Sequence, residues 1–98
     1  MTTEVVFAPT ARRDLERLDR QVARRILRAI QRYAASGLGD IARIQGSPGE
    51  FRLRVGDWRV RFAQSLVSRP AELPETGEVQ VRVIEVLHVL PRGRAYRG

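Results

Sequence analysis

The sequence has no cysteine, no lysine and only one histidine, His88. The absence of cysteine excludes disulfides and thiolate metal sites, and it agrees with the reducing cytoplasm. The absence of lysine means that no side-chain amine can act as a general base, because arginine stays protonated throughout the physiological pH range. With one histidine and scattered carboxylates, the sequence predicts neither a metal site nor a cofactor.

Long hydrophobic stretches are also missing. The longest strongly apolar run, residues 83–90, contains Glu85 and His88 and is far too short to span a bilayer. Residues 1–7 lack the basic start and the long apolar segment of a secretory signal. A chain of 98 residues fits one compact domain. We therefore expect a single cytoplasmic domain over residues 1–98, with no membrane partner.

Arginine, in contrast, is abundant. All 18 basic side chains are arginine, and with 11 acidic side chains the formal net charge is +7. A small basic domain usually binds a polyanion or an acidic protein. The alternative is a basic surface that is merely solvated. We favour that interpretation for Arg20, Arg24 and Arg28, which repeat at helical spacing.

The first third of the chain predicts one strand and two helices. Residues 2–7 are β-prone and predict a short strand. Pro9 suits the first turn of a helix that continues to about Leu18. Asp19 is a suitable N-cap for a second helix with one apolar stripe, which ends at Gly37. Because almost no linker separates them, the two helices are expected to form a hairpin.

The remainder of the chain predicts a β-sheet. Residues 40–49 indicate a connection punctuated by glycine and proline. Residues 51–62 alternate apolar and polar side chains on both sides of Gly56–Asp57, which is typical of a hairpin with a two-residue turn. Residues 65–77 predict an acidic loop, and residues 78–90 predict a long central strand. We therefore expect an α+β fold: an N-terminal strand, a two-helix hairpin and then a three-stranded, mainly antiparallel sheet.

The predicted turn determines which side chains of the hairpin share a face. Arg54 then pairs with Arg59, and Arg52 pairs with Arg61, while the apolar residues share the other face. Like charges directly opposite each other destabilise a sheet by roughly 0.2–1 kcal/mol per pair. The four arginines either extend into solvent over apolar surface or bind phosphate, which guanidinium groups contact through two hydrogen bonds. We favour phosphate binding.

The C-terminal tail adds polar side chains at the end of the predicted strand. Arg92, Arg94, Tyr96 and Arg97 follow residue 90 almost at once, so the tail could fold back beside the hairpin arginines. Tyr96 is the only side chain of the tail, apart from arginine, that can form hydrogen bonds or exchange a proton. The alternative is a tyrosine that only packs. We interpret His88, inside the strand, as structural, and the role of Glu85 stays open.

The order of these elements resembles the RelE/ParE superfamily of toxins from type II toxin–antitoxin systems. The residues that carry the resemblance are the hairpin FRLRVGDWRVRF and the segment VRVIEVLHVLPRGRAYR, and it extends over nearly the whole chain. The resemblance implies an α+β fold with helices on one face of a mainly antiparallel sheet. It also implies a cognate acidic antitoxin that wraps the toxin, covers its basic face and sets its oligomeric state.

Members of the RelE branch cleave mRNA in the ribosomal A site, where the ribose 2′-hydroxyl attacks the adjacent phosphate without a metal or cofactor. The resemblance implies that Arg52 and Arg54 lie near the scissile phosphate. It implies that Arg59 and Arg92 stabilise the pentacovalent phosphate, and that Tyr96 stacks on a nucleotide or transfers a proton.

The sequence departs from that branch at Arg52 and Arg54, where other members often have lysine. Arginine cannot act as a base, so that role would pass to Tyr96 or be dispensed with. This is chemically acceptable, because electrostatic stabilisation is commonly the larger catalytic effect. The alternatives are a ParE-type inhibitor of DNA gyrase and a non-catalytic domain that binds nucleic acid or an antitoxin. The further RNA-binding residues that we expect are Arg61, Arg94 and Arg97.

Overall fold

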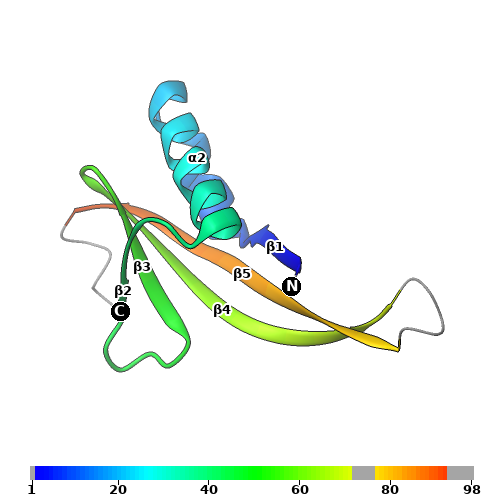
Figure 1. Ribbon diagram of the computed structural model, residues 1–98. Helices are drawn as coiled ribbons and strands as arrows, with labels where there is room; N and C mark the ends of the chain where they lie inside the picture. Colours follow the sequence, from blue (N-terminus) through cyan, green and yellow to red (C-terminus); the bar gives the residue numbers. More distant parts are fainter. Residues whose placement is uncertain (1, 72–76, 93–98) are drawn as a thin grey trace.

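The computed structural model describes residues 2–71 and 77–92. In these residues two helices lie on one side of a mixed five-stranded sheet (Figure 1), and the strand order is β1-β5-β4-β3-β2. The elements in chain order are β1 (Thr2–Phe7), α1 (Pro9–Glu16), α2 (Arg20–Ser36), β2 (Asp40–Arg43), β3 (Glu50–Val55), β4 (Trp58–Pro70) and β5 (Glu78–Pro91). None of the helices in this part of the chain is long and apolar enough to cross a membrane.

The helices begin and end close to the predicted positions. Pro9 is the first residue of α1, which ends slightly before the predicted end at Leu18. Asp19 caps α2, because its Oδ2 accepts a hydrogen bond from the backbone N–H of Gln21 at 3.0 Å. At the other end Gly37 has φ +75°, a left-handed conformation that glycine adopts without steric cost. The structure therefore confirms both predicted cap residues of α2.

Removing the Asp19 side chain tests the N-cap. In Asp19→Ala the N–H of Gln21 loses its acceptor, and we expect the free energy of unfolding to fall by about 1 kcal/mol. Asp19→Asn should keep nearly all of the stability, because asparagine caps a helix about equally well. Urea denaturation followed by circular dichroism measures both variants. Equal losses would mean that the carboxylate charge, and not the hydrogen bond, stabilises the helix.

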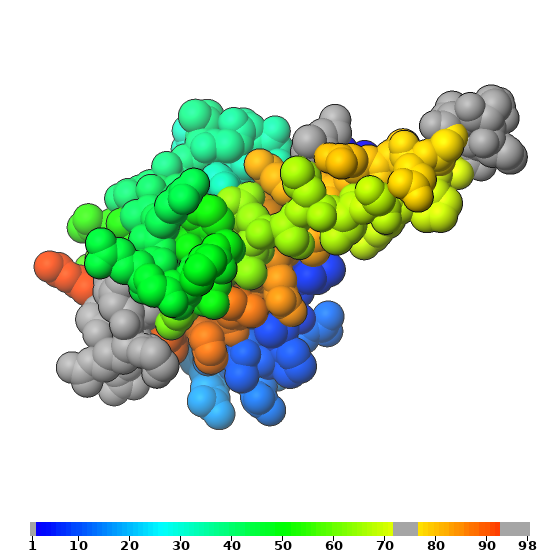
Figure 2. Space-filling model, turned by 90° about the horizontal axis from the view of Figure 1, so that it is seen from below, coloured from blue at the N-terminus to red at the C-terminus, as the bar shows by residue number. Residues whose placement is uncertain are grey.

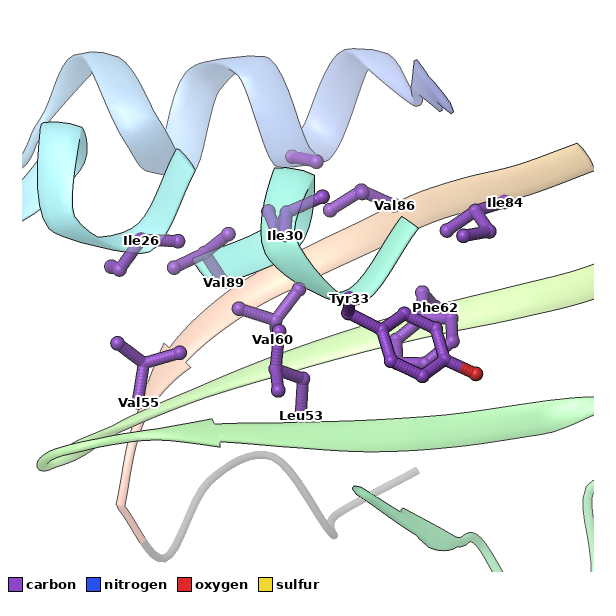
Figure 3. Close-up of a cluster of buried hydrophobic side chains, with 11 residues drawn as sticks. Ile26, Ile30, Tyr33, Leu53, Val55, Val60, Phe62, Ile84, Val86 and Val89 are labelled. Carbon is purple, nitrogen blue, oxygen red and sulfur yellow. The ribbon is translucent and has the colours of Figure 1, made fainter. Parts of the chain in front are cut away.

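The core lies between α2 and the centre of the sheet (Figure 3). Ile26, Ile30 and Tyr33 repeat at helical spacing along α2 and pack against buried side chains of β3, β4 and β5. Phe62 on β4 is 2% exposed, and its ring centroid lies 5.3 Å from that of Tyr33. The core thus combines one helical stripe with alternate residues of neighbouring strands. The other buried members are Ala11, Leu53, Val55, Val60, Ile84, Val86 and Val89.

The predicted three-stranded sheet is extended at both edges, by the predicted N-terminal strand, β1, and by a strand that the sequence did not predict, β2. β1 pairs with β5 in parallel orientation, and β2 pairs with β3 in antiparallel orientation. The prediction of a connection over residues 40–49 is wrong for Asp40–Arg43, which is β2. A four-residue edge strand is held mainly by backbone hydrogen bonds to one neighbour, so its side chains carry little of the alternation that identifies longer strands.

β4 is longer than the hairpin prediction allows, and it forms a two-stranded arm with β5, which spans the predicted residues 78–90 and Pro91. β4 continues as far as Pro70, which pairs with Glu78. The predicted loop over residues 65–77 is therefore wrong for residues 65–70. Pro70 suggested a loop, but it stands at the end of the strand, where its missing N–H removes no interior ladder bond. In Figure 1 the arm extends away from the helices.

A β-bulge in β5 explains why the buried positions of this strand change parity after Val86. Leu87 is the extra residue, opposite the step from Arg61 to Phe62 in β4. Because of this insertion, the buried positions pass from Val86 to Val89. Glu85 precedes the buried Val86, so it projects from the sheet face away from the helices and is exposed.

The first turns of α1 cover the edge of β5 where β1 has ended. The hydroxyl of Thr10 donates to the carbonyl of Leu87 at 2.8 Å, and the backbone N–H of Val89 donates to Oδ2 of Asp14 at 2.9 Å. His88 lies beside this contact, with its Nδ1 3.7 Å from the same carboxylate oxygen. Helix α1 therefore provides hydrogen-bond partners for backbone groups at this edge of β5, which would otherwise be free to pair with another strand.

Candidate nucleic-acid interface

The β3–β4 hairpin has the predicted register. Its pairs across the strands are Val55↔Trp58, Arg54↔Arg59, Leu53↔Val60 and Arg52↔Arg61. Leu53 and Val60 are buried against the helices, so the alternate side chains project from the opposite side of the sheet, from which Figure 2 views the molecule. We call these alternate residues the arginine face; its members are Arg52, Arg54, Arg59 and Arg61.

Two members of the arginine face are paired with carboxylates. Nη1 of Arg52 lies 3.2 Å from Oδ1 of Asp40, and Nε of Arg61 donates to Oε1 of Glu50 at 3.0 Å. The Arg52 and Arg61 side chains are 15% and 14% exposed. These pairs offset the repulsion between the two directly opposed arginines. The sequence predicted the arginines of this face but not their acidic partners.

Arg59 is largely buried beside the hairpin turn. It is 5% exposed, and its Nη1 donates to the carbonyls of Gly56 at 2.8 Å and Trp58 at 3.0 Å. Both carbonyls belong to the turn or its first flanking residue. Arg59 therefore combines a fixed positive charge with a structural role in the turn, which the alternation of the sequence does not reveal.

Positive charge collects around the hairpin turn. Arg54 is exposed and forms no ion pair with any other residue that the structure describes. The backbone N–H of Arg92 donates to the carbonyl of Asp57 at 2.8 Å, which fixes the backbone of this exposed residue beside the turn. A β-carbon on Gly56 would lie only 3.1 Å from Nη2 of Arg25, so α2 also brings a guanidinium to the turn. We call the arginines near the turn the turn cluster: Arg54 and Arg59 belong to the sheet face away from the helices, Arg92 lies beside the turn, and Arg25 approaches the turn from the helix side.

Sequence reasoning missed Arg25. The arginines of α2 suggest only a solvated basic surface, and the position of Arg25 over the turn depends on how α2 crosses the hairpin. No local pattern records that crossing. The structure brings Arg92 to the hairpin, as the sequence predicts, whereas the other tail residues in the prediction, Arg94, Tyr96 and Arg97, lie outside the described residues.

The turn cluster can stabilise an oxyanion. Guanidinium groups match the oxygen geometry of phosphate, and charge that develops near fixed cations is stabilised without reorganisation of solvent. None of the four guanidiniums can accept a proton. The cluster therefore offers binding and electrostatic stabilisation rather than base catalysis. Within residues 2–71 and 77–92, no group of three or more His, Cys, Asp or Glu side chains could hold a metal ion.

Comparisons with known proteins agree with this architecture. A chain of the RelB–RelE antitoxin–toxin complex from Methanococcus jannaschii is 23% identical, with 93% of this chain and 94% of that chain covered and a TM-score of 0.61. A chain of the archaeal RelE–RelB complex from Pyrococcus horikoshii OT3 is 24% identical, with 97% and 100% covered and a TM-score of 0.65. These likenesses establish the fold. No curated protein matches the sequence significantly.

The sequence itself also matches a family model. The model describes the ParE toxin of the type II toxin–antitoxin system parDE, and the match covers residues 5–96. It therefore includes both helices, the arginine face and the turn cluster. The chain belongs to the ParE toxin family, within the RelE/ParE superfamily of type II toxin–antitoxin toxins.

Proposed function

We propose that this toxin is a ribosome-dependent mRNA endonuclease that stops translation by cutting the codon in the A site. The observation that carries the proposal is the turn cluster, in which Arg54 and Arg92 are exposed and Arg59 is anchored beside them. Such an arrangement suits a phosphate, which accepts several charge-assisted hydrogen bonds at once. The chains of similar fold come from RelE–RelB complexes, and the proposed activity is of the RelE type.

In the proposed reaction the ribose 2′-oxygen attacks the adjacent phosphorus. The bond from phosphorus to the 2′-oxygen forms and the bond to the 5′-oxygen breaks, which leaves a 2′,3′-cyclic phosphate and a 5′-hydroxyl. The 2′-hydroxyl loses its proton, and the departing 5′-oxygen gains one; we assign this transfer to Tyr96. Because the nucleophile belongs to the substrate, the reaction requires no metal-bound water. Arg59 and Arg92 stabilise the charge of the pentacovalent phosphate.

We also propose that the toxin acts in the cytoplasm and is controlled there by an acidic antitoxin. A net charge of +7 favours fast association with an acidic partner. The two archaeal proteins of similar fold are each bound to an antitoxin, RelB. An antitoxin that covers the turn cluster would exclude RNA from it and would set the oligomeric state of the complex.

Arg54→Ala tests the proposed RNA contact. The wild-type toxin added to a cell-free translation reaction should produce cuts inside A-site codons. Arg54→Ala should slow cleavage roughly tenfold, because it removes a charged, exposed donor to phosphate. Arg28→Ala removes the same charge from the exposed surface of α2 and should leave the rate nearly unchanged. Primer extension measures all three proteins, and intact mRNA with folded wild-type toxin would reject the proposal.

A second candidate is inhibition of DNA gyrase, and the match to the ParE family model favours it. In that case the basic surface would contact gyrase or its DNA and would cleave nothing. A supercoiling assay with purified gyrase separates the two functions. Inhibition by the toxin, without cuts in translated mRNA, would establish the second candidate. Undisturbed supercoiling at an excess of toxin would eliminate it.

A further inference from the structure

Asp40 and Glu50 place carboxylate oxygens against two members of the arginine face. Nη1 of Arg52 lies 3.2 Å from the Asp40 carboxylate and 3.3 Å from the Asp40 carbonyl. Arg61 donates from Nε to Glu50, and its Nη2 lies 3.5 Å from the hydroxyl of Ser47. Carboxylates and phosphates offer guanidinium groups the same kind of charged oxygen. Each carboxylate therefore acts as an internal counter-ion.

The two sides of these ion pairs differ in exposure. The Arg52 and Arg61 side chains are 15% and 14% exposed, whereas the Asp40 and Glu50 side chains are 57% and 29% exposed. Nε of Arg52 is buried and has no hydrogen-bond partner among the described residues. The arginines are thus held in the sheet with donor capacity left over. The Asp40 side chain is exposed and that of Glu50 is half-buried, and neither residue belongs to the hydrophobic core.

We propose that Asp40 and Glu50 are specificity-determining residues that suppress the binding of free RNA to the arginine face. This inference rests on the proposed action on RNA. A phosphate of free RNA must displace a carboxylate to reach Arg52 or Arg61. Because one ion pair then replaces another, the net gain in binding free energy is small. An RNA held in place by other contacts has already lost its translational freedom, so its phosphates can displace the carboxylates at a smaller cost in entropy.

Neutralising both carboxylates tests the proposal. Asp40→Asn and Glu50→Gln keep a hydrogen-bond acceptor beside each arginine but remove the charge. The probe is a fluorescein-labelled single-stranded RNA oligonucleotide without ribosomes, and fluorescence anisotropy measures its affinity across a series of salt concentrations. We expect the double variant to bind roughly tenfold more tightly at about 0.1 M salt. Two new phosphate contacts should also make the logarithmic salt dependence steeper by roughly 1.4.

The matched control is the double variant Glu16→Gln, Glu78→Gln. These two exposed carboxylates form no ion pair with another described residue, and their neutralisation changes the net charge equally. A second control adds Asp40→Asn to Arg52→Ala, where no gain in affinity should occur. Thermal melting confirms that each variant is folded.

Three outcomes would overturn the proposal: an unchanged affinity in the double variant, an equal gain in the Glu16/Glu78 control, or a gain from Asp40→Asn without Arg52. The first would mean that the ion pairs only stabilise the sheet, and the other two would mean that net charge alone sets the affinity. The measurement contains no ribosome, so it is independent of cleavage. Tighter binding without any cleavage of translated mRNA would reject the proposed endonuclease and leave this inference standing.

Discussion

Arg59→Ala is expected to reduce ribosome-dependent cleavage by about 10²–10³-fold, the usual effect of removing one fixed group that stabilises transition-state charge. Arg59 is 5% exposed, and its hydrogen bonds to the carbonyls of Gly56 and Trp58 hold its charge in place before substrate binds. The same bonds stabilise the turn, so the free energy of unfolding should also fall, by about 1–3 kcal/mol. Single-turnover primer extension and urea denaturation measure the two effects.

Two further variants separate the loss of charge from the loss of structure. Arg59→Lys retains a cation but cannot reproduce the planar guanidinium, so it should recover part of the stability and little of the activity. Arg24→Ala removes one positive charge from the exposed surface of α2 and should retain both the wild-type stability and the wild-type cleavage activity. A folded Arg59→Ala toxin that cleaves at the wild-type rate would exclude Arg59 from the catalytic site.

Phe62→Ala is expected to lower the free energy of unfolding by about 3–5 kcal/mol. Phe62 is 2% exposed, and its ring lies between those of Tyr33 and Phe51, with centroid separations of 5.3 Å and 5.7 Å. Truncation removes both aromatic contacts and leaves a cavity where α2 meets the sheet. Because domains of this size are stable by only about 5–15 kcal/mol, the variant should be largely unfolded at moderate temperature. Urea denaturation or differential scanning calorimetry measures the loss.

Leu66→Ala is the matched control for this prediction. Leu66 lies on the same strand, but in the arm, and it is 57% exposed. Its truncation should change the free energy of unfolding by less than about 0.5 kcal/mol, as is usual for exposed positions. If both variants lost stability equally, the arm would have to be covered in solution, and the single core described above would be incomplete.

The hairpin is the part of the fold that the sequence predicts best. Strict alternation around Gly56–Asp57 leaves one sensible register, and the structure has that register. The caps Asp19 and Gly37 are predicted equally well, because each depends on a local backbone requirement. The N-terminal strand is also correct, although its parallel pairing with β5 is a long-range choice that residues 2–7 alone do not determine.

The environment of each arginine could not be predicted in the same way. Alternation places Arg52 and Arg61 on one face, but their partners depend on β2 and the start of β3 lying beside them. The sequence did not predict β2, so the position of Asp40 beside Arg52 could not be predicted either. The burial of Arg59 and the approach of Arg25 likewise depend on how separate elements pack. Local patterns predict faces and caps, whereas the exposure and pairing of charges follow from tertiary contacts.

The position of β1 has a consequence for folding during protein synthesis. β1 is synthesised before the other described strands, yet among them it pairs only with β5, from Thr2↔Val81 to Phe7↔Val86. β5 also supplies the core residues Ile84, Val86 and Val89. A nascent chain whose β5 has not yet left the ribosome therefore has neither a complete sheet nor a closed core. Contacts between residues so distant in sequence form late in folding. Folding must follow translation of nearly the whole domain, so an interrupted message yields no folded toxin.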